Sequence, residues 1–153
     1  MSFETGSCMC GACQVIAKPT GEAEVCHCSL CRNWSGGAFI GVICDGPVFF
    51  NDGAPLAIYR STPWGERVSC RHCGSSLVMR MQDGSSHVAS VQVFDDPGRF
   101  PILTEIFIDR KPASYSFSLR SPRSRTGSGR PLSGEQSMIC PPQRPAQMDL
   151  HGT

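Results

Sequence analysis

The segment Cys26-His27-Cys28-Ser29-Leu30-Cys31-Arg32 places three thiols within six residues. Thiols so close together are poorly placed to bridge one another, but they can hold one soft metal ion. If the segment enters as a strand, its first two thiols share a face and the histidine between them points the opposite way. A turn after Cys28 would then bring in Cys31 as a third ligand. Three thiolates leave a tetrahedral ion one ligand short, which is typical of a catalytic metal site.

Two further cysteine pairs flank this triplet. Cys8 and Cys10 form a second C-x-C motif, and Cys70 and Cys73 belong to a C-x-x-C-G motif whose glycine permits a tight turn. Each pair lacks two ligands for a tetrahedral ion, so the simplest interpretation joins both pairs in one closed, structural zinc site. Two alternatives stay open: one pair could belong to the triplet's ion, and Cys13 could compete for metal with Cys10.

The chain of 153 residues has a length typical of one domain with a moderate core. Its ten cysteines raise the possibility of a secreted disulfide scaffold. The first six residues, however, lack the basic and apolar regions of a signal peptide. No apolar run approaches the roughly 18 residues of a membrane span. These features predict a cytoplasmic protein without a membrane partner, whose reduced thiols bind zinc, with a redox role or disulfides as alternatives.

Hydrophobic patterning indicates strands throughout the first 109 residues. Short apolar or alternating runs are separated by turn-forming residues, and helical spacing never persists for more than about two turns. Turns are expected at Pro19-Thr20-Gly21, and a loop is expected over Arg32–Gly37. The Cys8–Cys10 motif is also expected on a strand. The expected strands are Ala12–Lys18, Glu22–Cys28, Ala38–Cys44, Val48–Phe50, Leu56–Ser61, Glu66–Ser69, Ser76–Met81, His87–Phe94 and Ile102–Asp109.

The composition changes after Phe117. Residues 1–117 hold nine Lys or Arg against eleven Asp or Glu, a net charge of −2. Residues 118–153 hold five Arg against two acidic residues, a net charge of +3, with little to bury. We therefore expect a zinc-binding domain over 1–117 and a poorly structured Arg/Ser/Pro-rich tail over 118–153. The overall charge of +1 does not recruit nucleic acid, and the tail would allow only weak, salt-sensitive contact with it.

The motifs in this order resemble the glutathione-dependent formaldehyde-activating enzyme family. The resemblance extends over roughly residues 3–117. The residues that carry it are Gly6-x-Cys8-x-Cys10-Gly11, Cys26-His27-Cys28-x-x-Cys31-Arg32 with Gly36 behind it, Cys70-x-x-Cys73-Gly74 and Ile106-Phe107-Ile108-Asp109-Arg110-Lys111-Pro112.

This resemblance implies an all-β, zinc-containing fold of the β-tent type, built of short antiparallel strands. It implies the S-(hydroxymethyl)glutathione synthase reaction, a carbon–sulfur lyase activity that joins glutathione to formaldehyde or a similar small aldehyde. It also implies two zinc ions. The implied ligands are Cys8, Cys10, Cys70 and Cys73 for a structural ion, and Cys26, Cys28 and Cys31 for a catalytic one.

A zinc ion held by three thiolates has a net charge of −1 and is a weak Lewis acid. Its better role is to accept a fourth thiolate and lower the pKa of that thiol. Glutathione would supply this sulfur, and Arg32 is the candidate to bind one of its carboxylates. Trp34 either lines the pocket or belongs to the core.

Two other functions fit the same motifs. One is a non-catalytic zinc-binding module, and the other is a metal or redox buffer that loads and loses zinc. The sequence makes no prediction of the oligomeric state.

Overall fold

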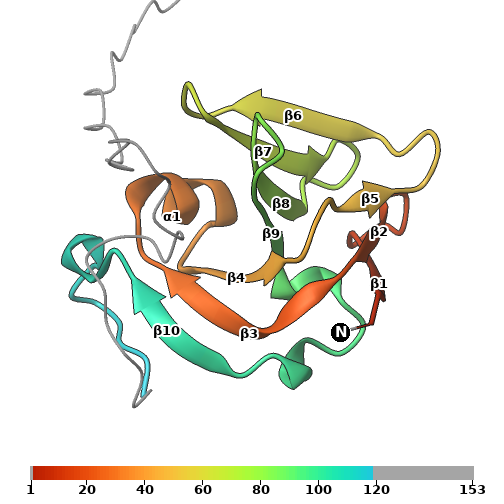
Figure 1. Cartoon of the computed structure of the whole chain (residues 1–153). Helices are drawn as coiled ribbons and strands as arrows, with labels where there is room; N and C mark the ends of the chain where they lie inside the picture. The colour runs from red at the N-terminus through yellow and green to blue at the C-terminus, as the bar shows by residue number, and fades with distance from the viewer. Residues whose placement is uncertain (1, 119–153) are drawn as a thin grey trace, which may run out of the picture.

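The computed structural model describes residues 2–118, and most of them lie in two β-sheets (Figure 1). The expected tail over 118–153, which includes Cys140, lies outside the described residues except for Ser118. The all-β fold class is confirmed. Along the part described, a single α-helix interrupts the strands, and it follows the cysteine triplet's first two members.

The smaller sheet contains three antiparallel strands in the order β1-β2-β5. The strands are β1 (Glu4–Ser7), β2 (Gln14–Ala17) and β5 (Phe49–Phe50). In β2, Val15 and Ala17 are fully buried while Gln14 and Ile16 are exposed, as the alternation in the sequence predicts. This sheet therefore packs on the core with one face and meets solvent with the other.

The larger sheet contains seven strands in the order β10-β3-β4-β9-β8-β7-β6. Strand β3 ends at the cysteine triplet, and β7 ends at the C-x-x-C-G motif, so this sheet positions the triplet and one of the two cysteine pairs. The strands are β3 (Pro19–Cys26), β4 (Phe39–Cys44), β6 (Leu56–Arg60), β7 (Gly65–Cys70), β8 (Ser76–Met81), β9 (His87–Ser90) and β10 (Ile102–Ile106).

One strand pair differs from the expected antiparallel arrangement. Strand β10 pairs with β3 in parallel, with Glu105 opposite Val25 and Ile106 opposite Cys26. After β9 the chain passes through two short 3₁₀ helices, η1 (Val91–Val93) and η2 (Pro97–Arg99), before it enters the sheet edge beside β3 (Figure 1). A parallel neighbour requires such a crossover, because a tight hairpin can join only antiparallel strands.

The region after the first two triplet cysteines is a helix rather than the expected loop. Helix α1 covers Ser29–Ser35, and strand β3 stops at Cys26 instead of continuing to Cys28. The Cys28 sulfur caps the helix by accepting from the backbone N–H of Cys31 at 3.3 Å. Gly36 ends it with a φ of 76°, a left-handed conformation that glycine adopts without strain. The cysteine spacing thus builds a helix start and brings the Cys31 sulfur close to those of Cys26 and Cys28.

Two other local expectations are also wrong. Pro19-Thr20-Gly21, expected as a turn, belongs to β3, where the register with β4 shifts between Pro19 and Ala23. Cys8–Cys10, expected on a strand, forms the turn that follows β1, and the Gly11 N–H closes it on the Cys8 carbonyl at 3.0 Å. Local composition places the ends of strands and turns only approximately.

The buried side chains form two clusters. The larger one packs between the sheets, with Val15, Val42, Val68 and Leu77 among its fully buried members. The smaller one consists of the three triplet cysteines together with Phe39 and Ile106, and Trp34 and Phe107 pack on it. The triplet therefore lies in a local core of its own beside α1. A third 3₁₀ helix, η3 (Ile108–Arg110), follows β10.

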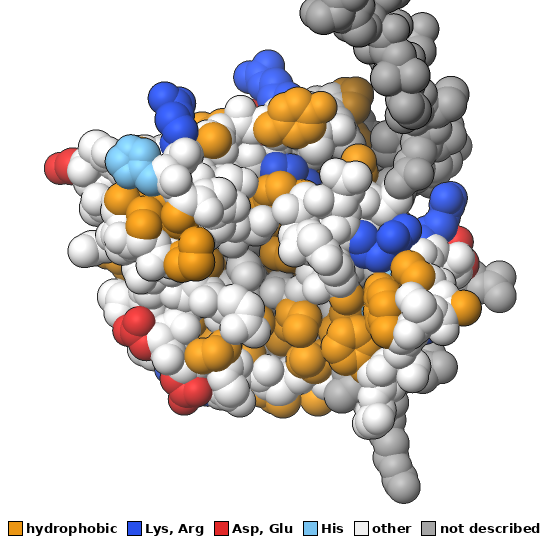
Figure 2. All heavy atoms as spheres, turned by 180° about the vertical axis from the view of Figure 1, so that it is seen from behind, with side chains coloured by type: hydrophobic (Ala, Val, Ile, Leu, Met, Phe, Trp, Pro, Cys, Tyr) orange, Lys and Arg blue, Asp and Glu red, His pale blue; other side chains and the backbone are white. Residues whose placement is uncertain are grey.

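The surface of the described residues carries both charge signs. On the face shown in Figure 2, apolar side chains lie in several groups, with basic and acidic side chains around them. No helix within 2–118 is long and apolar enough to cross a membrane.

Candidate metal centres

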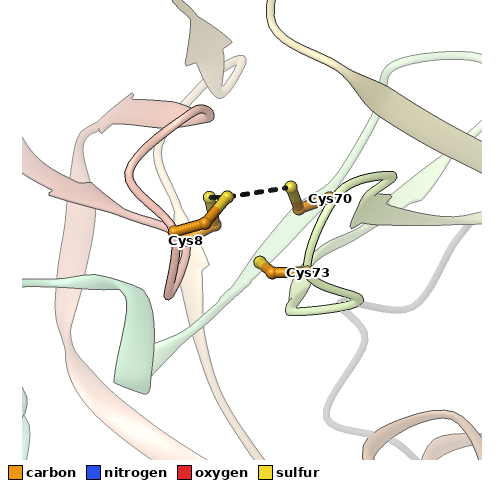
Figure 3. Close-up of side chains that lie close together, drawn as sticks. Cys8, Cys70 and Cys73 are labelled. Carbon is orange, nitrogen blue, oxygen red and sulfur yellow. Dashed lines mark hydrogen bonds between the residues drawn. The ribbon is translucent and has the colours of Figure 1, made fainter.

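Four cysteines from distant parts of the sequence converge between the two sheets. Cys8 and Cys10 come from the turn after β1, and Cys70 and Cys73 come from the end of β7 and the turn behind it (Figure 3). The Gly74 N–H closes that second turn on the Cys70 carbonyl at 2.9 Å, with a φ of 77° at the glycine. The structure therefore brings together the two cysteine pairs that the sequence predicts to share one ion.

The spacing of these four sulfurs fits a tetrahedral metal ion. All four lie within 4.8 Å of one another, with 3.5 Å between Cys8 and Cys10 and 3.8 Å between Cys10 and Cys70. A zinc–sulfur bond of about 2.3 Å at tetrahedral angles separates the sulfurs by about 3.8 Å. Donor chemistry and geometry both match a closed site.

Hydrogen-bond donors already favour negative charge on two of these sulfurs. The hydroxyl and backbone N–H of Ser75 lower the pKa of Cys73 to about 5. Burial raises the pKa of Cys8, but the Cys13 backbone N–H at 3.2 Å and the neighbouring thiols outweigh it, so that pKa is lowered overall. The pKa of Cys10 is raised to about 11, because the nearby thiols, Cys8 first, outweigh the Ala12 backbone N–H. A cation would be needed to deprotonate all four.

The fifth cysteine of this region points elsewhere. The Cys13 thiol donates to the Pro55 carbonyl at 3.7 Å, and burial raises its pKa to about 12. Cys13 is not part of the group of four sulfurs that lie close enough to share an ion. Cys44, the last residue of β4, is buried as a small hydrophobic residue would be.

The second group of sulfurs contains three residues. Cys26 ends β3, Cys28 caps α1 and Cys31 lies in the first turn of that helix, and their sulfurs are all within 4.8 Å of one another. Each of the three residues is only 5–6% exposed. Among the residues described, no fourth Cys, His, Asp or Glu joins this group. The triplet is therefore more buried than the group of four and has one potential ligand fewer.

The three thiols differ in how readily each would lose its proton. Contacts from Cys26 and Cys28, with a further contribution from the charge of Arg67, lower the pKa of Cys31 to about 3. The pKa of Cys26 is raised by its contacts with the other two sulfurs and by burial. For Cys28, contact with Cys31 and burial outweigh the lowering effect of Cys26, so its pKa is raised too. A bound cation would have to displace the protons from these two thiols.

Arg67 is a site residue that the sequence analysis missed. It lies in β7, is 4% exposed, and donates from Nη1 to the Cys31 sulfur at 3.4 Å. Its guanidinium also lies over the Trp34 ring, 5.2 Å from the ring centroid. Strand β7 contains Glu66 beside Arg67, so no local pattern separates Arg67 from a solvated charge; only its burial shows that it requires an anionic partner.

The histidine of the triplet motif serves a different contact. His27 is fully buried, with Nε2 at 2.9 Å from Glu105 Oε2 and Nδ1 at 3.1 Å from the Tyr115 hydroxyl. It therefore turns away from the thiols, as expected. These bonds tie the end of β3 to β10 and to the segment after η3, which closes over the histidine through the rings of Tyr115 and Phe117.

Arg32, the expected substrate contact, lies beside a small hollow. Its Nε donates to the His27 carbonyl at 2.9 Å, and its side chain lines a hollow of about 200 Å³ together with Ser29, Gly36 and Tyr115. Trp34 lines a larger hollow of about 770 Å³ on the other side of α1, and its indole N–H donates to Ser69 Oγ at 2.9 Å. Both alternatives for Trp34 therefore apply, since it also packs on the triplet cluster.

A family model, a curated relative and a solved structure are similar to this chain, and the family model identifies a family. A model described as "Glutathione-dependent formaldehyde-activating enzyme" matches residues 3–110. An uncharacterized lyase of Schizosaccharomyces pombe is 26% identical over 117 residues, which cover 74% of this chain and 84% of the relative.

A crystal structure of a Rhodobacter sphaeroides protein shares the fold, with a TM-score of 0.52 and 22% identity over 64% of this chain and 98% of that one. The family match covers more than half of the sequence and contains all seven clustered cysteines. The chain therefore belongs to the glutathione-dependent formaldehyde-activating enzyme family, a family of carbon–sulfur lyases that act on glutathione and formaldehyde.

Proposed function

We propose that this chain is a zinc-dependent lyase of the S-(hydroxymethyl)glutathione synthase type, with two zinc ions. Cys8, Cys10, Cys70 and Cys73 hold the structural ion in this proposal, and Cys26, Cys28 and Cys31 hold the catalytic one. The observation that carries it is the difference in ligand number, four sulfurs in one group and three in the other. Closed sites stabilise folds, whereas an open position admits a substrate.

The chemistry assigned to the second site is thiolate supply. Zinc held there would offer a position for the glutathione sulfur and lower the pKa of that thiol below its usual value of about 8.5. The sulfur then attacks the aldehyde carbon: a carbon–sulfur bond forms, the carbonyl π bond breaks, and the oxygen takes up a proton. The thiol loses one proton and the product hydroxyl gains one, so the addition is balanced. Holding both reactants together adds proximity to this activation.

The protein's own residues suggest where the tripeptide lies. Arg32 at the smaller hollow is the candidate partner for a glutathione carboxylate, because a guanidinium binds a carboxylate with two hydrogen bonds. The larger hollow on the opposite side of α1 has the polar lining that a peptide backbone needs, with Asn33, Ser35 and Gln92. Asn33 and Gly36 line both hollows, so a ligand could follow the end of the helix from one to the other.

Adduct formation at equal glutathione concentration tests the proposal. Wild type, Cys31→Ser, Cys44→Ala and buffer alone are compared, because the uncatalysed addition also proceeds. Cys44→Ala is the matched control, since it removes a buried thiol outside both groups. We expect wild type and Cys44→Ala to exceed buffer, and Cys31→Ser to fall to the buffer rate. Equal rates in all four samples would reject the enzymatic function.

The second candidate is a non-catalytic zinc-binding module. The burial of all three triplet sulfurs favours it, because a shielded ion is harder for a substrate to reach. In that case wild-type protein would contain zinc but would not accelerate adduct formation. For either candidate a reducing compartment such as the cytoplasm is the proposed location, and all nine described cysteines are free thiols.

A further inference from the structure

Arg67 is buried in the middle of β7, next to a core residue. It is 4% exposed, and its neighbour Val68 is fully buried. A guanidinium in such a place requires an anion, because removing one ion from water without a partner costs roughly several kcal/mol.

The neighbouring carboxylate in the sequence is already engaged elsewhere. Glu66 lies with Oε2 at 2.9 Å from Arg80 and Oε1 at 3.5 Å from Arg60. Arg67 instead donates from Nη1 to the Cys31 sulfur at 3.4 Å. Its Nε is buried and has no hydrogen-bond partner within the described part of the chain. The anion that Arg67 faces is thus the thiolate group of the triplet.

The position of the guanidinium is held by α1. Its plane lies over the Trp34 ring at 5.2 Å, and Trp34 in turn donates to Ser69 at 2.9 Å. Arg67 and Ser69 are two residues apart in one strand, so they share a face. The same face of β7 therefore holds both the helix and the cation against the triplet. This arrangement leaves the guanidinium few alternatives to Cys31.

The net charge of the triplet with a bound divalent ion explains why a cationic side chain beside it is useful. Three thiolates and a divalent ion sum to −1, and this charge would be buried. A guanidinium at 3.4 Å brings the total to zero. Binding of one further thiolate then creates a net charge of −1 rather than −2. At the four-cysteine group Cys10 is exposed, so water can solvate the corresponding charge.

We propose that Arg67 is a positioning residue that supplies the countercharge for the metal held by the triplet and favours an anionic sulfur as its fourth ligand. The inference rests on the proposed function, in that a divalent ion binds to Cys26, Cys28 and Cys31. Arg67 acts through Cys31 and through charge, and it contributes no ligand atom.

Metal release from the whole chain tests this role. Zinc transfer to a chromophoric chelator is followed for wild type, Arg67→Gln, Arg67→Lys and Arg80→Gln. Arg67→Gln keeps a hydrogen-bond donor but removes the charge, whereas Arg67→Lys keeps the charge. Arg80→Gln is the matched control, since Arg80 pairs with Glu66. We expect Arg67→Gln to release one of two ions about 10 to 100 times faster, as typical for loss of a residue behind a metal ligand. Arg67→Lys should restore much of the retention, and the control should release both ions as wild type does.

Cobalt-substituted protein tests the ligand preference without any activity measurement. Uptake of 2-mercaptoethanol and of imidazole is followed through the visible cobalt spectrum. Arg67→Gln should weaken binding of the thiol, which binds as an anion, by about tenfold relative to imidazole, which binds neutral. If Arg67 had only a structural role, Arg67→Gln would weaken binding of the thiol and of imidazole equally.

Three results would overturn the inference: wild-type release rates in Arg67→Gln, equally fast release from Arg67→Lys and Arg67→Gln, or an unchanged preference between thiol and imidazole. Failure of the proposed function looks different, because wild-type protein would then contain one ion or would not bind the thiol. If Arg67→Gln does not fold, Arg67→Met and Arg67→Lys form the same charge comparison on a side chain of similar length.

Discussion

The two cysteine groups use the same ligand atom in different surroundings. The group of four joins two turns, with Cys10 and Cys70 separated by 60 residues, and includes the exposed Cys10. The triplet comes from one continuous segment and is buried, with Arg67 as its neighbour. A site that joins distant segments constrains the fold, whereas a site built within one segment is less necessary for folding and can be kept open for chemistry. This contrast leads to predictions about stability that separate the two groups.

The largest effect is expected from Cys73→Ser. This change removes one of four ligands from the site that holds the turn after β1 against the turn after β7, so zinc binding no longer adds its full free energy to folding. We expect the free energy of unfolding to fall by more than about 4 kcal/mol, measured by denaturant unfolding in the presence of zinc. Cys44→Ala, which removes a buried thiol outside both groups, should cost only about 1 kcal/mol. Similar losses in the two variants would show that the group of four does not stabilise the fold.

A smaller effect is expected from Cys28→Ser, compared with Cys28→Ala. Both changes remove a triplet thiolate, and elemental analysis should show the loss of one zinc ion of two. Serine can still accept the Cys31 N–H at the start of α1, so Cys28→Ser should remain folded. Alanine cannot, and it should cost about 1 kcal/mol more. If Cys28→Ser unfolds as completely as Cys73→Ser, the proposed division between a structural and a functional site is wrong.

The smallest effect is expected from ending the chain after Phe117. This shorter chain keeps Tyr115 and Phe117, whose rings cover His27, and it keeps both cysteine groups. Its thermal stability should change by no more than about 0.5 kcal/mol, and its zinc content should stay the same. A chain ended after Arg110 is the comparison, because it loses the hydrogen bond from Tyr115 to His27 and should be less stable by about 1 kcal/mol or more. A large loss on removing 118–153 would show that those residues support the domain.

Much of the local structure could be predicted because it depends on neighbouring residues. The alternation in β2, the bounds of β8 (Ser76–Met81) and the tight turn at Gly74 follow from side-chain period and glycine position. Helix α1 could not be predicted by the same means. Its seven residues are too few for a helical period, and its start depends on the Cys28 sulfur acting as a cap.

The sequence by itself determined which donor atoms this protein offers: ten cysteines, seven of them in motifs whose spacing predicts two joined pairs and a separate triplet. Only the tertiary structure decided what surrounds those thiols. Arg67 contacts Cys31, which is 36 residues away in the sequence. Glu105 contacts His27, which is 78 residues away, because β10 pairs with β3 in parallel, and no local sequence pattern predicts that pairing. The physical reason is that ligand type is a property of each residue, whereas burial and countercharge depend on which strands become neighbours in the sheet.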